Sequence, residues 1–184
     1  MNRYDATSEY IVALPLRLTL NWRGSALTSV ALDWAGPDAS NHETVPSPGL
    51  SPRTASLHGA LARYLEEGCT EWPWIRLDFS QVSPFAAMIL ETLRTEIGPG
   101  ETISYGDLAT LCGCKGAARA IGQVMATNPW PLLVPCHRVR GADGRLGGFS
   151  GAGPRMKSFL LRLEGSLDTG GELNTTRRRS TSPA

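Results

Sequence analysis

Two runs of alternating apolar and polar residues near the start of the chain predict paired β-strands. Over residues 14–22 every second side chain is large and apolar, which is typical of a strand with one buried face. After turn residues at 23–25, residues 26–34 carry a second apolar set and predict the returning strand of a hairpin. The apolar positions are Leu14, Leu16, Leu18, Leu20 and Trp22, then Ala26, Val30, Leu32 and Trp34.

The next fifty residues predict a loop, a helix and a further strand. Residues 35–53 are rich in Pro, Gly, Ser and Asn, which is typical of a loop. Apolar residues at positions 57, 61, 64 and 65 have helical spacing, and Gly68 supplies a stop signal. Ile75, Leu77 and Phe79 alternate in the segment WIRLDF and predict a strand. We therefore expect residues 1–80 to form a small mixed α/β domain.

Helical periodicity dominates the second half of the chain. Ser83 followed by Pro84 is a favourable start for a helix that ends before Gly98. Residues 105–111 and 115–126 predict two helices around the turn sequence CGC, which is the outline of a helix-turn-helix. A last amphipathic helix carries the apolar residues Met156, Phe159, Leu160 and Leu163.

Together these patterns indicate an α+β protein with three regions. A mixed α/β domain with a strand hairpin and a helix covers residues 1–80. A mostly helical domain with the helix-turn-helix covers residues 81–165. Residues 166–184 contain almost nothing apolar to bury, so we expect a disordered tail.

Composition and charge exclude several classes of protein. The chain has 184 residues, of which 41% are hydrophobic and 19% charged, as expected for a globular protein. No segment has the run of about 20 apolar residues that spans a bilayer, and the N-terminal residues do not resemble a secretory signal. Four cysteines in such a chain favour free thiols in a reducing compartment, so we expect a cytoplasmic protein. Residues 81–165 carry 9 Lys and Arg against 6 Asp and Glu, a weak sign of a polyanionic partner.

The segment NPWPLLVPCHRVRG, residues 128–141, places a thiol beside a proton acceptor after three prolines. Only the thiolate of Cys136 is nucleophilic, and His137 can accept its proton, directly or through water. Glu164 is a candidate to hold the far nitrogen of the imidazole, as in a nucleophile–base–orienter triad. Taken alone, a Cys-His pair is more often a small buried residue beside a structural histidine than a catalytic pair.

Small residues also leave one side of the preceding helix nearly bare. Ala117, Ala118 and Gly122 let its backbone approach another surface closely, and Arg119 projects from among them. One interpretation is a helix packed on protein, with Arg119 in a salt bridge. The other is DNA binding, in which an inserted side chain fills the gap that an extruded base leaves.

Taken in order, the motifs ARAIG, NPWP and PCHRV resemble those of the O6-alkylguanine-DNA alkyltransferases. The resemblance runs from about Ser83 to Gly165 and includes GETISYGDLA and LLRLEG. It implies a single-turnover methyltransferase that moves an alkyl group from guanine O6 in double-stranded DNA to a cysteine. It also implies a monomer without cofactor or metal, and leaves repair of O4-alkylthymine open.

The resemblance also implies roles for individual residues. Cys136 would become a permanent thioether, with His137 acting through water and Glu164 fixing the imidazole. Tyr105 would help to swing the nucleotide outward and donate a hydrogen bond to the leaving guanine. Asn128 would form hinge hydrogen bonds between the recognition helix and the active-site segment.

For DNA, the resemblance implies that the helix-turn-helix enters the minor groove and that Arg119 occupies the stack of the flipped guanine. The other DNA-binding residues that we expect are Lys115, Ala117, Ala118 and Gly122. The guanine pocket is expected to be lined by Pro135, Val139, Phe149 and Ser150.

Three features depart from the family pattern, and two other functions stay open. Phe149 replaces a common tyrosine, GAGPRMK looks one residue longer than the related loop, and SPFAAMIL lacks a common glutamine.

One alternative is a DNA-binding module that marks damage without repairing it, although such proteins usually lack the cysteine. The other is a Cys-His hydrolase, although nothing around Cys136 resembles a protease signature. Cys112 and Cys114 lack a second pair, so a zinc site is not expected.

Overall fold

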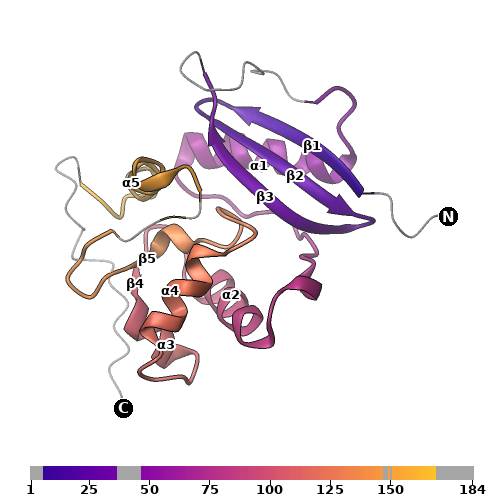
Figure 1. The fold of residues 1–184 in the computed structure, drawn as a ribbon. Helices are drawn as coiled ribbons and strands as arrows, with labels where there is room; N and C mark the ends of the chain where they lie inside the picture. Colours follow the sequence, from indigo (N-terminus) through magenta and orange to yellow (C-terminus); the bar gives the residue numbers. More distant parts are fainter. Residues whose placement is uncertain (1–5, 37–46, 147–148, 150, 169–184) are drawn as a thin grey trace. The chain divides into compact units, whose positions relative to one another are not determined.

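The computed structural model describes residues 6–36, 47–146, 149 and 151–168, and it divides into two compact units, Met1–Gln81 and Val82–Ala184. Among these residues it has a three-stranded antiparallel sheet and five α-helices, which confirms the expected α+β class (Figure 1). No helix among the described residues is both long and apolar enough to cross a membrane.

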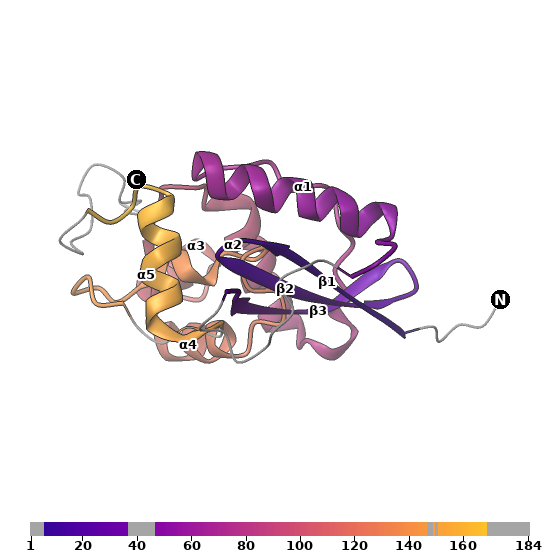
Figure 2. The ribbon, with the colours of Figure 1, turned by 90° about the horizontal axis from the view of Figure 1, so that it is seen from above.

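The first unit is a sheet with one helix packed on it. Its strands β1 (Ala6–Ala13), β2 (Leu16–Arg23) and β3 (Ala26–Trp34) lie in the order β1-β2-β3. The apolar side chains of β2 are at most 1% exposed while its polar side chains lie nearer the surface, as the alternation predicts. Helix α1 (Pro52–Glu67) packs against β1 and runs along the sheet (Figure 2). It ends at Gly68, whose φ of 69° suits glycine and whose N–H bonds to the carbonyl of Tyr64.

Three sequence predictions for this unit were wrong. Strand β1 was not predicted, and Leu14, which was placed on the buried face, lies between β1 and β2 with 65% of its surface exposed. Residues 74–79 form no strand: Leu77 makes one isolated bridge with Leu27, and a short 3-10 helix spans Phe79–Gln81. Helix α1 begins inside the expected loop, because Ser51 and Thr54 anchor its first turn to the carboxylate of Glu9.

The second unit begins with α2 (Pro84–Glu96), where the Ser83 hydroxyl caps the helix by accepting from the N–H of Ala86, as predicted. Strand β4 (Ile103–Ser104) leads into α3 (Tyr105–Leu111), and α4 (Ala118–Ala126) packs on α3. A 3-10 helix (Cys136–Arg138) then runs into β5 (Val139–Arg140), which pairs in parallel with β4. The last helix is α5 (Gly153–Leu163). The β4–β5 pairing brings the start of α3 next to the segment that carries Cys136.

Two boundaries in this unit differ from the predictions. Helix α4 begins at Ala118 instead of Lys115, because Gly116 has a φ of 89°, which ends regular helical geometry before that point. The predicted disordered tail begins too early, since Ser166 and Leu167 are buried and their N–H groups bond to the carbonyl of Leu161. Residues 169–184 of the predicted tail lie outside the described residues.

Candidate active site

The segment from Trp130 to Arg140 is buried throughout, so Cys136 lies on a fixed arm. The N–H of Val134 bonds to the carbonyl of Trp130 over 2.8 Å, which closes the arm into a turn. Within that turn Leu132 has a φ of 75°, a conformation that only surrounding packing keeps in a residue with a side chain. Cys136 opens the following 3-10 helix and is 3% exposed. The thiol is therefore held in place by backbone geometry on both sides.

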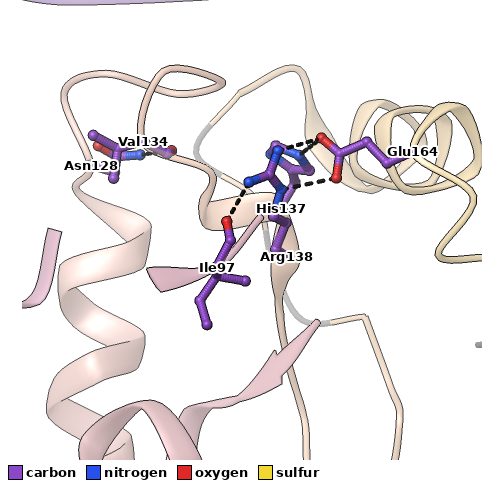
Figure 3. Close-up of polar contacts among 6 residues, drawn as sticks. All are labelled: Ile97, Asn128, Val134, His137, Arg138 and Glu164. Atoms are coloured by element: carbon purple, nitrogen blue, oxygen red, sulfur yellow. Dashed lines mark hydrogen bonds and ion pairs between the residues drawn. The ribbon is translucent and has the colours of Figure 1, made fainter. Parts of the chain in front are cut away.

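Asn128 ties the end of α4 to the arm and to the sulfur. Its Nδ2 donates to the carbonyl of Val134 over 3.0 Å and to Cys136 Sγ over 3.1 Å. Its Oδ1 accepts from the N–H of Trp130 over 3.0 Å (the Asn128–Val134 bond is drawn in Figure 3). A donor aimed at the sulfur favours the thiolate over the thiol, because hydrogen bonds to the charged form stabilise it.

The carboxylate of Glu164, at the end of α5, receives three hydrogen bonds from the segment after Cys136. Oε1 accepts from His137 Nε2 and from Arg138 Nη2, and Oε2 accepts from Arg138 Nε, all over 2.9 Å (Figure 3). The side chains of His137 and Glu164 are fully buried. Burial alone would raise the pKa of Glu164, but the attraction and hydrogen bonds of His137 and Arg138 outweigh it and lower the pKa to about 2.

These contacts fix the protonation of the imidazole. Burial lowers the pKa of His137, although Glu164 opposes the effect, so the ring is neutral near pH 7. An ionised carboxylate can only accept, so the single ring proton sits on Nε2 and points to Glu164. Nδ1 then carries a lone pair, and it has no hydrogen-bond partner among the described residues. A neutral imidazole with a free lone pair, beside a thiol, is the arrangement of a general base.

Lys157 is a second buried cation that the sequence analysis missed. Its residue is 0% exposed, and its Nζ donates to the carbonyl of Val139 over 2.6 Å. Burial lowers the pKa of Lys157 to about 8, and the charge of Cys136 opposes that decrease. A positive charge coupled to the sulfur favours the thiolate. The sequence did carry one sign of this role: Lys157 lies two helical turns before Glu164 in the predicted last helix.

Two aromatic side chains border this centre. Tyr105 opens α3 and is half-buried, and burial, followed by the charge of Cys136, raises the pKa of its hydroxyl. Phe149 meets the His137 ring edge-on, with the centroids 6.3 Å apart. A Cβ on Gly151 would lie 2.4 Å from the Phe149 ring, so glycine is required there for this placement. Of the other predicted pocket residues, Pro135 and Val139 are buried beside Cys136, and Ser150 lies outside the described residues.

The residues predicted to bind DNA lie on α4 and on the turn before it, and none of them belongs to the buried centre around Cys136. Arg119 is exposed on the first turn of α4, and Lys115 is exposed in the preceding turn. Ala117 and Ala118 are partly exposed, and a Cβ on Gly122 would meet nothing within 4 Å. No salt bridge of Arg119 is found among the described residues, in contrast to the packed-helix interpretation.

Comparison with known proteins points to one family. The family model for the 6-O-methylguanine DNA methyltransferase DNA-binding domain matches residues 84–166. The methylated-DNA–protein-cysteine methyltransferase of Mus musculus is 41% identical over 126 residues, which cover 67% of this chain and 58% of that protein. The chain thus spans little more than half the length of that relative.

A mycobacterial relative matches over most of its length. The Mycobacterium tuberculosis methylated-DNA–protein-cysteine methyltransferase is 39% identical over 150 residues, which cover 81% of this chain and 86% of that protein. The crystal structure of Mycobacterium tuberculosis OGT in complex with DNA superposes with a TM-score of 0.65 at 36% identity, and covers 84% of this chain and 90% of its own. By these matches, the chain belongs to the methylated-DNA–protein-cysteine methyltransferase family.

Proposed function

We propose that this protein repairs alkylated DNA by moving the alkyl group from guanine O6 to Cys136, once per molecule. The observation that carries the proposal is the buried constellation around the sulfur: an amide donor on Sγ and a neutral imidazole held by an ionised carboxylate. In the reaction the Sγ–C bond forms while the C–O6 bond breaks. The thiol proton passes to His137 and from there, through water, to the departing guanine, so His137 ends neutral and charge and atoms balance. No cofactor or metal takes part in this displacement.

His137 acts as the base, and Asn128 and Lys157 support the thiolate. Nδ1 of His137 accepts the thiol proton through a water molecule, and the resulting imidazolium is stabilised by Glu164. In-line displacement at a saturated carbon requires sulfur, carbon and leaving oxygen to align, which the fixed arm serves. A thioether is not hydrolysed under mild conditions, so the reaction ends with the alkylated protein.

Tyr105 serves the leaving group. Its hydroxyl is protonated at neutral pH, and burial raises its pKa further, so it can donate a hydrogen bond as negative charge develops on guanine. Pro135, Val139 and Phe149 line the guanine pocket in this proposal. Because Phe149 has no hydroxyl, the pocket offers one donor fewer than a tyrosine would.

Duplex DNA is the partner, bound by a monomer through α3 and α4 as a helix-turn-helix. The exposed face of α4 has little side-chain bulk at Gly122, which suits close approach in the narrow minor groove. Arg119 is exposed at the front of that helix, where it can fill the stack after the guanine leaves it. Lys115 adds a phosphate contact, so duplex affinity should weaken with salt.

The test is intact-protein mass spectrometry after mixing the protein with a duplex that contains one O6-methylguanine. We expect the gain of one methyl group per molecule, mapped to Cys136, with the guanine restored in the DNA. The Cys136→Ala variant should bind the same duplex and gain no mass. Tight binding without mass gain by the wild type would favour the damage-marking module instead, and repeated turnover of an ester or peptide would favour the hydrolase.

A further inference from the structure

Arg138, the residue after His137, makes three hydrogen bonds that the function proposed above does not use. Its Nε and Nη2 donate to the two carboxylate oxygens of Glu164. Its Nη1 donates to the carbonyl of Ile97 at the end of α2 (Figure 3). The residue is 5% exposed, and Glu164 has no exposed side-chain surface. A two-pronged arginine–carboxylate pair in such a setting fixes both the position and the charge of the carboxylate.

The negative charge of Glu164 acts against the neutral form of His137 that a general base needs. A carboxylate beside an imidazole raises the pKa of the ring and so favours the imidazolium. An imidazolium has no lone pair and cannot accept the proton of a thiol. The carboxylate must therefore orient His137 without charging it.

The other charged groups around His137 show how this is arranged. Burial is the largest influence on His137 and lowers the pKa of the ring. Glu164, on α5, raises that pKa, whereas Arg138, on the same 3-10 helix, and Lys157, on α5, lower it further. Cys136 precedes His137 and is the group that gives up the proton. Of the two cations, Arg138 contacts the carboxylate directly, so it offsets the negative charge at the atoms that face the ring.

We propose that Arg138 is a positioning residue for the transfer reaction: by occupying Glu164 with two hydrogen bonds, it keeps His137 neutral and oriented with Nδ1 available to the thiol. Arg138 touches neither DNA nor the sulfur in this role and acts only through Glu164. The inference rests on the proposed function of His137 as the base.

Arg138→Met tests the proposal, with Arg140→Met as the matched control. Arg140 is also a buried arginine, two residues further on, but its Nε donates to Thr102 and its Nη1 to the carbonyl of Gly141. Both variants lose a buried guanidinium, but only the first loses the hydrogen bonds that Arg138 donates to Glu164. The second-order rate constant of methyl transfer from an O6-methylguanine duplex is measured between pH 5.5 and 9.

We expect the acid limb of the profile to move upward by roughly one to two pH units in Arg138→Met. Its rate should fall far more at pH 6.5 than at pH 8.5, and Arg138→Lys, which restores one charge, should recover part of the limb. Arg140→Met should change the rate by the same factor at every pH. A pH-independent loss in Arg138→Met would mean that Arg138 only anchors α2 through Ile97, and would overturn the proposal.

Two further measurements separate the possible failures. If Arg138→Met does not fold, ¹⁵N NMR of histidine-labelled wild type and Arg138→Lys decides: a higher His137 pKa in the variant supports the proposal, and an equal pKa overturns it. If His137→Ala transfers methyl groups as fast as the wild type, the proposed base itself is wrong. Slow transfer by His137→Ala together with an unshifted profile in Arg138→Met rejects the role of Arg138 alone.

Discussion

Replacing Glu164 by glutamine should destabilise the folded protein by about 3 kcal/mol at neutral pH. Three donors converge on the two carboxylate oxygens, and an amide offers them only one acceptor oxygen, so a buried guanidinium or imidazole N–H loses its partner. Leaving one member of a buried ion pair uncompensated costs about 3 to 5 kcal/mol.

The pKa of Glu164 leads to a similar magnitude. It falls from 4.5 to about 2 in the folded protein. At about 1.4 kcal/mol for each pH unit, ionisation favours the folded state by about 3 kcal/mol. Because the folded pKa is depressed, this contribution is complete above pH 4.5 and disappears as the pH falls toward 2. By pH 3 the difference between the wild type and Glu164→Gln should be less than about half its neutral value.

Urea denaturation followed by far-UV circular dichroism, at pH 7.5 and pH 3, measures the two differences. Glu91→Gln is the control, because Glu91 is an exposed carboxylate on α2 and its loss should change stability by no more than about 0.5 kcal/mol. A loss below 1 kcal/mol for Glu164→Gln at pH 7.5, or an equal loss at both pH values, would refute the reasoning.

Three other substitutions test the sulfur's surroundings and the DNA-facing helix. Asn128→Ala removes the donor to Cys136 Sγ and the bonds to Val134 and Trp130, so methyl transfer should slow at least tenfold and unfolding should become easier by about 2 kcal/mol, measured by single-turnover kinetics and urea denaturation. Lys157→Met removes a cation coupled to the sulfur, and transfer at pH 7 should slow by roughly tenfold, which equals about 1.4 kcal/mol; an unchanged rate would show that the coupling is unimportant. Gly122→Leu adds a side chain in open space, so we expect a stability gain of about 0.5 to 1 kcal/mol together with weaker binding to duplex DNA in a fluorescence-anisotropy titration. Unchanged duplex affinity in that variant would place the DNA on another surface.

Local signals in the sequence were sufficient for several elements of the second unit. The Ser83-Pro84 pair and the residues of α3 were predicted where the structure has them, because a cap and one helical turn are encoded within a few neighbouring residues. The motif around Cys136, with Glu164 as partner of His137, was also identified from sequence, and the structure brings these two together.

Other features depend on contacts that no local pattern contains. Strand β1 is defined by its pairing with β2, and the segment WIRLDF alternates like a strand but finds only one bridge. The Asn128–Sγ bond was likewise not predicted, because it depends on how the turn of the arm folds back on the end of α4.

By itself, the sequence determined the family and singled out the proposed nucleophile and base, since these follow from residue types in a fixed order. The tertiary structure alone decided which distant residues surround the proposed base. Arg138 bonds to Glu164, which is 26 positions away in the sequence, and to Ile97, which is 41 positions away. Lys157 bonds to Val139, which is 18 positions away. Burial makes those pairings obligatory, because an uncompensated charge in the interior is costly, yet the identity of each partner is set only when distant segments pack.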